Sequence, residues 1–63
     1  MEVDKDAVYV MVHIMRMGCV IDVCYDKNPT SENYVTVELP KVPHLSELKQ
    51  LYPNAEIEVR DRR

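Results

Sequence analysis

Residues 7–17, AVYVMVHIMRM, read as a β-strand with two apolar faces, and this segment constrains the fold more than any other. β-Branched side chains alternate along one face of the strand, and tyrosine, methionine and histidine occupy the other. The first face carries Val8, Val10, Val12 and Ile14, and the second carries Tyr9, Met11, His13, Met15 and Met17. A strand that is apolar on both faces is covered on both. We therefore expect a helix over one face and another protomer or a binding target over the other.

The methionines of this segment allow two interpretations. Met11, Met15 and Met17 form with Tyr9 a soft apolar strip that suits an adaptable protein interface. The same side chains can instead pack under a loop in the core of the monomer. The sequence leaves both interpretations open.

Three further segments alternate between apolar and polar residues. Residues 19–26 follow the chain's single glycine, Gly18, which we expect to mark a turn. Residues 34–39 follow the turn-forming segment KNPTSEN, so a hairpin across residues 27–33 is the simplest arrangement. The third alternating segment is residues 55–60. In residues 34–39 and 55–60 the inward positions are Val35, Val37, Leu39, Ala55, Ile57 and Val59.

A short helix is predicted between the last two strands. Pro40 and Pro43 break the preceding strand, and Pro53 ends the helix. Its apolar residues fall at i, i+3, i+6 and i+7, on one side of the helix (Leu45, Leu48, Leu51 and Tyr52). We expect Leu45 and Leu51 in the core, whereas Leu48 and Tyr52 fit either the core or a partner-binding surface.

These elements predict an α+β fold in the order β-β-β-α-β. The sheet has three or four strands, is antiparallel or mixed, and carries one short helix on one face. The chain forms a single domain, 1–63, with residues 1–6 and 61–63 as flexible ends. A domain of this length buries only about 60% of the surface of its unfolded chain, so its stability is marginal and a second copy would help.

The composition is that of an ordinary globular protein, with 46% hydrophobic and 30% charged residues. No apolar segment approaches the roughly 20 residues that a membrane-spanning helix needs. The N-terminal MEVDKD is acidic where a signal peptide is basic. We therefore expect a cytoplasmic protein that has no membrane partner.

The charges are unevenly distributed along the chain. The net charge is −3, yet Arg60, Arg62 and Arg63 lie within the last four residues. Residues 1–59 therefore hold ten acidic and five basic residues, which gives this part a net charge of −5. An acidic body disfavours direct nucleic-acid binding, because that requires a basic surface to neutralise phosphates.

The sequence gives little support to a catalytic site or a metal site. One glycine is too few for a phosphate-binding loop. His13, His44, Cys19 and Cys24 match no zinc-ligand spacing. In a strand the two cysteines point to opposite faces and cannot bridge, and their apolar surroundings raise a thiol pKa rather than lower it. We expect a protein that is not an enzyme and has no cofactor or metal.

The acidic residues of the strands gather on the outward faces, at Asp22, Asp26, Glu38, Glu56 and Glu58. Carboxylates at positions i and i+2 of a strand are about 6.8 Å apart. That distance is about two nucleotide steps along a DNA strand. Such a row can imitate phosphates, or it can simply be the solvated face of a small acidic protein.

The segment LSELKQLYPN, residues 45–54, resembles a family of very small phage-encoded inhibitors of uracil-DNA glycosylase. Members have short strands, a final strand, and one helix with a Leu-Ser-acid-x-x-x-Leu-Tyr-x-Asn run. The matching positions are Leu45, Ser46, Glu47, Leu51, Tyr52 and Asn54, and the similar region extends from about residue 20 to residue 60.

This resemblance implies a dimeric DNA mimic that occupies the enzyme's DNA groove in the host cytoplasm. In the family, helix aromatics of two protomers form an apolar pocket for the enzyme's DNA-inserting leucine. Tyr52 matches one of these aromatics, and Leu48 stands in the place of another. Lys49 departs from the pattern, because the family has an acid there, and residues before the matching region have no counterpart.

The best hypothesis for function is a non-enzymatic inhibitor that blocks a host DNA-binding enzyme, with uracil-DNA glycosylase as the target and a homodimer as the active form. Its partner-binding residues are Leu48, Tyr52, Glu47, Glu38, Glu56 and Glu58. One alternative is a small protein-binding adaptor or structural module, and another is a different phage anti-defence protein that binds a host factor. A third is a nucleic-acid-binding accessory that acts through Arg60, Arg62 and Arg63.

Overall fold

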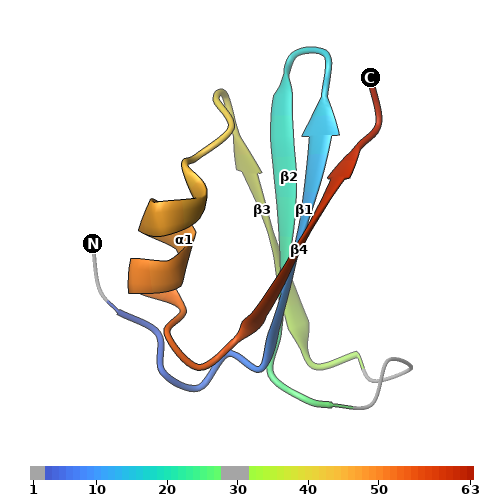
Figure 1. Cartoon of the computed structure of the whole chain (residues 1–63). Helices are drawn as coiled ribbons and strands as arrows, with labels where there is room; N and C mark the ends of the chain where they lie inside the picture. Colours follow the sequence, from blue (N-terminus) through green and yellow to red (C-terminus); the bar gives the residue numbers. More distant parts are fainter. Residues whose placement is uncertain (1–2, 28–31) are drawn as a thin grey trace.

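The computed structural model describes residues 3–27 and 32–63 and confirms the predicted α+β fold. Its elements follow the expected order β-β-β-α-β along the chain (Figure 1). They are β1 (Tyr9–Met15), β2 (Gly18–Cys24), β3 (Tyr34–Leu39), α1 (Leu45–Leu51) and β4 (Glu56–Asp61).

The four strands form one mixed sheet in the order β3-β2-β1-β4. β1 pairs antiparallel with β2 and parallel with β4, and β2 pairs antiparallel with β3, which confirms the predicted hairpin. The apolar strand β1 therefore has a neighbour on each side. This placement removes both of its edges from solvent, while β3 and β4 become the edges of the sheet.

Gly18 begins β2 directly after a two-residue turn. Its φ of +139° lies in a region that residues with a side chain rarely adopt. A Cβ atom at this position would lie 2.4 Å from the carbonyl oxygen of Leu39 on the neighbouring strand. Glycine is therefore required both for the backbone conformation and for the close approach of β3.

The connection from β3 to β4 carries the chain from one edge of the sheet to the other and places α1 over one face (Figure 1). Because β1 and β4 are parallel, a crossover of this kind is needed to bring β4 back in the right direction. The first helical hydrogen bond runs from the Leu48 amide to the His44 carbonyl. The helix ends at Leu51, and the amide of the capping residue Tyr52 donates to Leu48. Pro53 then prevents a further turn.

The core lies between α1 and the sheet. Alternate residues of the two central strands face the helix, as the sequence pattern predicts, and Leu48 is the helix residue that meets them. The fully buried residues are Ala7, Val10, Val12, Cys19, Ile21, Val23 and Leu48. No described polar or charged residue is buried.

Four residues expected in the core are exposed, and Leu51, also expected there, is only half-buried. Leu45 is 49% exposed, and Val35, Val37 and Val59 are also exposed although the strand register places them on the helix side. The reason is the size of the helix. The helix runs along the strands (Figure 1) and is about 10–12 Å wide with its side chains, whereas the edge strands of a four-stranded sheet are about 14 Å apart. The helix therefore covers the central strands, and the margins of the sheet stay open.

The segments that flank the strands are held by hydrogen bonds. The Asp4 amide donates to the Leu51 carbonyl, and the Tyr25 hydroxyl donates to the Asp4 carboxylate at 2.7 Å. At the other end the Arg62 amide donates to the Ile14 carbonyl. Among the described residues, no helix is long and apolar enough to cross a membrane.

The difference between Leu48 and Leu45 predicts the outcome of a matched pair of substitutions. Leu48→Ala should lower the free energy of unfolding by about 2–5 kcal/mol, because it leaves a cavity in a fully buried site. Leu45→Ala should cost less than about 1 kcal/mol, because half of that side chain is already in water. Urea unfolding followed by circular dichroism measures both. Equal losses would contradict the core described for α1.

Candidate functional site

The face of the sheet opposite α1, which we call the open face, is covered by no other described element. Its side chains come from the alternate positions of each strand that do not face the helix. The register brings them into rows across the sheet. The first row is Tyr34, Cys24, Tyr9 and Glu56, the second is Thr36, Asp22, Met11 and Glu58, and the third is Glu38, Val20, His13 and Arg60.

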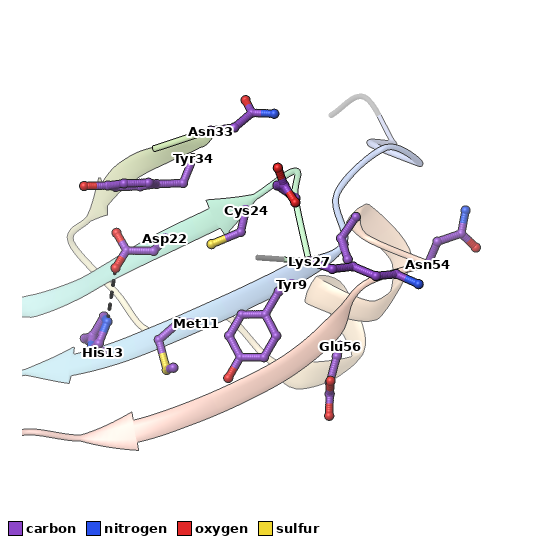
Figure 2. Close-up of a pocket in the computed structure, with 12 residues that line it drawn as sticks. Tyr9, Met11, His13, Asp22, Cys24, Lys27, Asn33, Tyr34, Asn54 and Glu56 are labelled. Atoms are coloured by element: carbon purple, nitrogen blue, oxygen red, sulfur yellow. Dashed lines mark hydrogen bonds and ion pairs between the residues drawn. The ribbon is translucent and has the colours of Figure 1, made fainter. Parts of the chain in front are cut away.

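A shallow hollow of about 880 Å³ lies over the first two rows. Figure 2 shows Tyr34, Cys24 and Tyr9 on three successive strands, with Glu56 on β4 beyond Tyr9. The side chain of Met11 lies beside Tyr9 in the same view. The hollow therefore has two tyrosines and two sulfur-containing side chains at its centre. The rest of its lining is Val8, His13, Asp22, Asp26, Lys27, Asn33, Asn54 and Glu56.

Asp22 is fixed at one side of the hollow by two neighbouring strands. One carboxylate oxygen accepts a hydrogen bond from the Thr36 hydroxyl at 2.8 Å. The other lies 3.2 Å from Nε2 of His13, and Figure 2 marks this contact. Both side chains of the His13–Asp22 pair are partly exposed. The pair joins β1, β2 and β3 through side chains and holds a negative charge in the middle of the open face.

Tyr9 and Glu58 form a second polar contact on this face. The Tyr9 hydroxyl donates to the Glu58 carboxylate, which also accepts from Nε of Arg60 at 3.2 Å. The hydrogen bond to Glu58 and burial raise the pKa of Tyr9 to about 12. The same hydrogen bond, together with Arg60, lowers the pKa of Glu58. At neutral pH the phenol therefore stays neutral and the carboxylate stays charged.

The two cysteines lie on opposite faces of the sheet, as predicted, and both are free thiols. Cys19 is in the core, and Cys24 lies in the hollow. Burial raises the pKa of both thiols, and the charge of Asp22 adds to the effect at Cys24. This direction agrees with the sequence-based expectation and disfavours a nucleophilic thiolate. The described residues contain no cluster of three potential metal ligands.

The structure divides the predicted partner-binding residues between two sides of the molecule. Glu38, Glu56 and Glu58 all lie on the open face. Glu38 is on the β3 edge and the other two are on the β4 edge, so about 14 Å of sheet separates them. Asp22 lies on the same face between them and is not in the predicted set.

The three helix residues of the predicted set are elsewhere. Leu48 is 2% exposed and belongs to the core, so its side chain offers a partner no surface in this conformation. Tyr52 packs partly against the core, where burial raises its pKa. Glu47 is exposed on α1, on the other side of the sheet from the open face. These residues do not form one binding surface with Glu38, Glu56 and Glu58.

The C-terminal arginines are largely paired with acids of the same segment. Arg60 contacts Glu58 at 3.2 Å, and Arg63 contacts Asp61 at 2.8 Å. The bonds from Arg63 lower the pKa of Asp61 to about 2. Pairing of this kind reduces the positive charge available for phosphates. It gives little support to a nucleic-acid-binding tail.

The hollow is the part of the site that the sequence pattern did not identify as a unit. Tyr9 and Met11 stood out as a strip, whereas Cys24 and Tyr34 were read only as positions in their own strands. The sequence feature that could have identified the hollow is the turn before Gly18. A two-residue turn places Tyr9 opposite Cys24, and continued pairing with β3 places Cys24 opposite Tyr34.

Comparison with known proteins adds no relative, because no family model, no curated protein and no solved structure matches this chain.

The Tyr9–Glu58 contact predicts how stability depends on high pH. The folded state keeps the Tyr9 proton beyond the ordinary pKa of 10, up to about 12. Its contribution to stability is therefore fully present below pH 10 and is lost as the pH rises towards about 12. Glu58→Gln should return the titration of Tyr9 towards 10, as measured by tyrosinate absorbance.

Tyr25 is an internal control for this experiment. Its pKa is also raised to about 12, but by a hydrogen bond to Asp4 at a different site. Glu58→Gln should leave the pKa of Tyr25 raised. Asp4→Asn should lower the pKa of Tyr25 and leave that of Tyr9 raised. A Glu58→Gln protein in which neither tyrosine titrates earlier would contradict the contact.

Proposed function

We propose that this protein is a non-enzymatic inhibitor that binds the basic DNA groove of an enzyme through its open face, with uracil-DNA glycosylase as the target. The observation that carries the proposal is the collection of four carboxylates on a sheet face that no described element covers. They are Asp22, Glu38, Glu56 and Glu58, against one arginine, Arg60, on the same face.

The spacing of these carboxylates suits a phosphate mimic. Glu56 and Glu58 are two residues apart on β4, which corresponds to about 6.8 Å. Glu38 lies across the sheet at about 14 Å, which is of the same order as the roughly 12 Å width of the DNA major groove. A basic groove that binds duplex DNA would therefore meet negative charge on both sides of this face.

The open face also suits binding rather than catalysis. Asp22 and Glu58 are held by neighbouring side chains, so they are already oriented before a partner arrives. Among the described residues, Glu38 and Glu56 form no ion pair at the sheet edges. Edge charges of this kind attract a basic partner during encounter and raise the association rate.

The resemblance of residues 45–54 to glycosylase inhibitors supports the choice of target, but the surface differs from the one it implies. Leu48 is in the core and Glu47 is on the opposite side, so the helix does not form the contact. The proposed contact is the open face instead. In this arrangement α1 acts as the support that holds the sheet from behind.

The direct test is a uracil-excision assay with purified glycosylase and increasing amounts of this protein. We expect loss of excision together with a complex that co-elutes in gel filtration. The protein alone should show no salt-dependent retention on DNA. Full excision with glycosylases from several sources, without a complex, would refute the proposed target.

A charge-removing pair of substitutions tests the proposed surface. Glu38→Gln with Glu56→Gln should slow association with the glycosylase by about threefold to tenfold at low salt, and should make association less dependent on salt. Stopped-flow or surface-based kinetics measures both effects. Dissociation should change less, because exposed charges act mainly on the rate of encounter and its salt dependence.

Glu47→Gln is the matched control for the single change Glu56→Gln, because each removes one charge, the first from the helix side of the molecule and the second from the open face. It should leave association unchanged if the open face binds. If Glu47→Gln slows association as much as Glu56→Gln, the effect reflects net charge and the open face is not the contact.

A different surface favours the homodimer expected for this protein. Four exposed apolar residues lie along β3 and the start of α1, namely Val35, Val37, Val42 and Leu45. β3 is also an edge strand, and no other described strand pairs with its outer backbone groups. The other edge, β4, is protected by charges at four of its six positions.

We propose that a second copy of the chain binds to this surface. Antiparallel pairing of two β3 strands would place Val35 of each copy opposite Val37 of the other, and Tyr34 opposite Glu38. This register sets no like charges opposite each other. It would join the two open faces into one continuous surface, in line with the expected homodimer.

Sedimentation equilibrium tests this pairing. Val35→Lys should shift the protein from dimer to monomer, because it places a charge in the apolar contact. Val59→Lys is the matched control, since Val59 is an exposed apolar residue of the opposite edge strand. A wild-type protein that is monomeric at all concentrations would refute the pairing and leave the inhibitor proposal untouched.

A further inference from the structure

We propose that the hollow of the open face is a receptor for an arginine side chain of the basic partner, with the aliphatic stem against Cys24 and Tyr34 and the guanidinium on Tyr9, close to the Glu56 carboxylate. This inference rests on the proposed function for the identity of the partner. It rests on the geometry of the hollow for the identity of the side chain.

The walls of the hollow suit a flat, cationic group. Tyr9 and Tyr34 lie in the same row with Cys24 between them, so their strands are about 10 Å apart. A guanidinium stacked on Tyr9 cannot also stack on Tyr34 across this distance, so the arginine stem spans Cys24 and packs on the Tyr34 ring. The polarizable sulfur of Cys24 lies between the two tyrosines in the row, and that of Met11 lies beside Tyr9 (Figure 2). The volume, about 880 Å³, falls within the usual range of ligand sites.

The charges around the hollow favour a cation. Among the described residues that line it are Asp22, Asp26 and Glu56, with Lys27 as the one lysine or arginine, which gives these residues a formal charge of −2 with His13 neutral. Asp22 already accepts from Thr36 and His13, but a carboxylate has about four acceptor positions and keeps room for a further donor. Among the described residues, Glu56 forms no ion pair and is the carboxylate most open to a guanidinium.

An arginine fits these groups better than a lysine or an apolar side chain. The guanidinium is planar, stacks on aromatic rings and presents several donors that match carboxylates. A lysine ammonium is compact and strongly hydrated, and it gains less from stacking. An apolar side chain would take water from Asp22 and Glu56 without supplying donors, which is unfavourable.

The test uses three short peptides that differ in one residue, Gly-Arg-Gly, Gly-Lys-Gly and Gly-citrulline-Gly, with blocked termini. Each is titrated into the isotopically labelled protein, and backbone amide shifts are followed by NMR. We expect the arginine peptide to shift the amides of Tyr9, Cys24 and Tyr34, the lysine peptide to bind more weakly, and the uncharged citrulline peptide to bind least. Equal binding of arginine and citrulline peptides, or shifts that lie elsewhere, would overturn the inference.

Substitutions in the hollow separate ring packing from charge. Tyr34→Ala should weaken binding of the arginine peptide by about twofold to fivefold, and Tyr34→Phe should restore it because the ring is kept. Glu56→Gln should weaken binding by a similar factor. Lys27→Gln should strengthen it, because this removes the competing cation. Glu47→Gln on α1 is the control and should have no effect.

The two proposals fail in different ways. If the glycosylase is inhibited but the arginine peptide does not bind, the open face acts as a charged surface and the arginine receptor is refuted. If the arginine peptide binds in the hollow but the glycosylase is not inhibited, the receptor holds and the proposed target is refuted. Tyr34→Ala should slow or weaken glycosylase binding only when both proposals are correct.

Discussion

Strand β1 is apolar on both faces, and the described part of the chain has one short helix with which to cover them. α1 spans seven residues and covers only one side of the sheet. The buried residues of β1, Val10 and Val12, accordingly face the helix, while Tyr9 and Met11 stay half-exposed on the other face. The candidate site follows from this shortage of covering structure. A longer connection between β3 and β4 would still leave the open face uncovered, because that connection runs along the helix side alone.

Alternation along the strands predicted which residues share a face, and the structure confirms this for all four strands. It could not predict the order of the strands, because alternation says nothing about neighbours. Burial was also harder to predict than orientation. Val35 and Val59 point towards the helix side, as expected, yet both are about half-exposed since they lie on the two edge strands. Their depth depends on the width of the sheet relative to the helix, which is a tertiary property.

The dependence on tertiary packing also explains why the residues of the predicted site lie on two sides of the molecule. Glu38, Glu56 and Glu58 were assigned to one surface from strand alternation, and the register supports that assignment. Leu48 and Glu47 were assigned from a similarity in helix sequence, which carries no information about the direction in which the helix faces. Packing determines that direction. The most central apolar position, Leu48, turns towards the sheet and leaves Glu47 on the far side.

The carboxylates of the open face differ in whether neighbouring side chains hold them in place. Asp22 and Glu58 accept hydrogen bonds from side chains on neighbouring strands, so their positions are fixed. Glu38 and Glu56 lie on the two edge strands, where a partner reaches them first. Fixed charges near the centre reduce the conformational entropy lost on binding, and accessible charges at the edges increase the rate of encounter. If the open face binds a basic partner as proposed, geometry at its centre and charge at its margins would both select that partner, so specificity should depend on the hollow lined by Tyr9 and Tyr34.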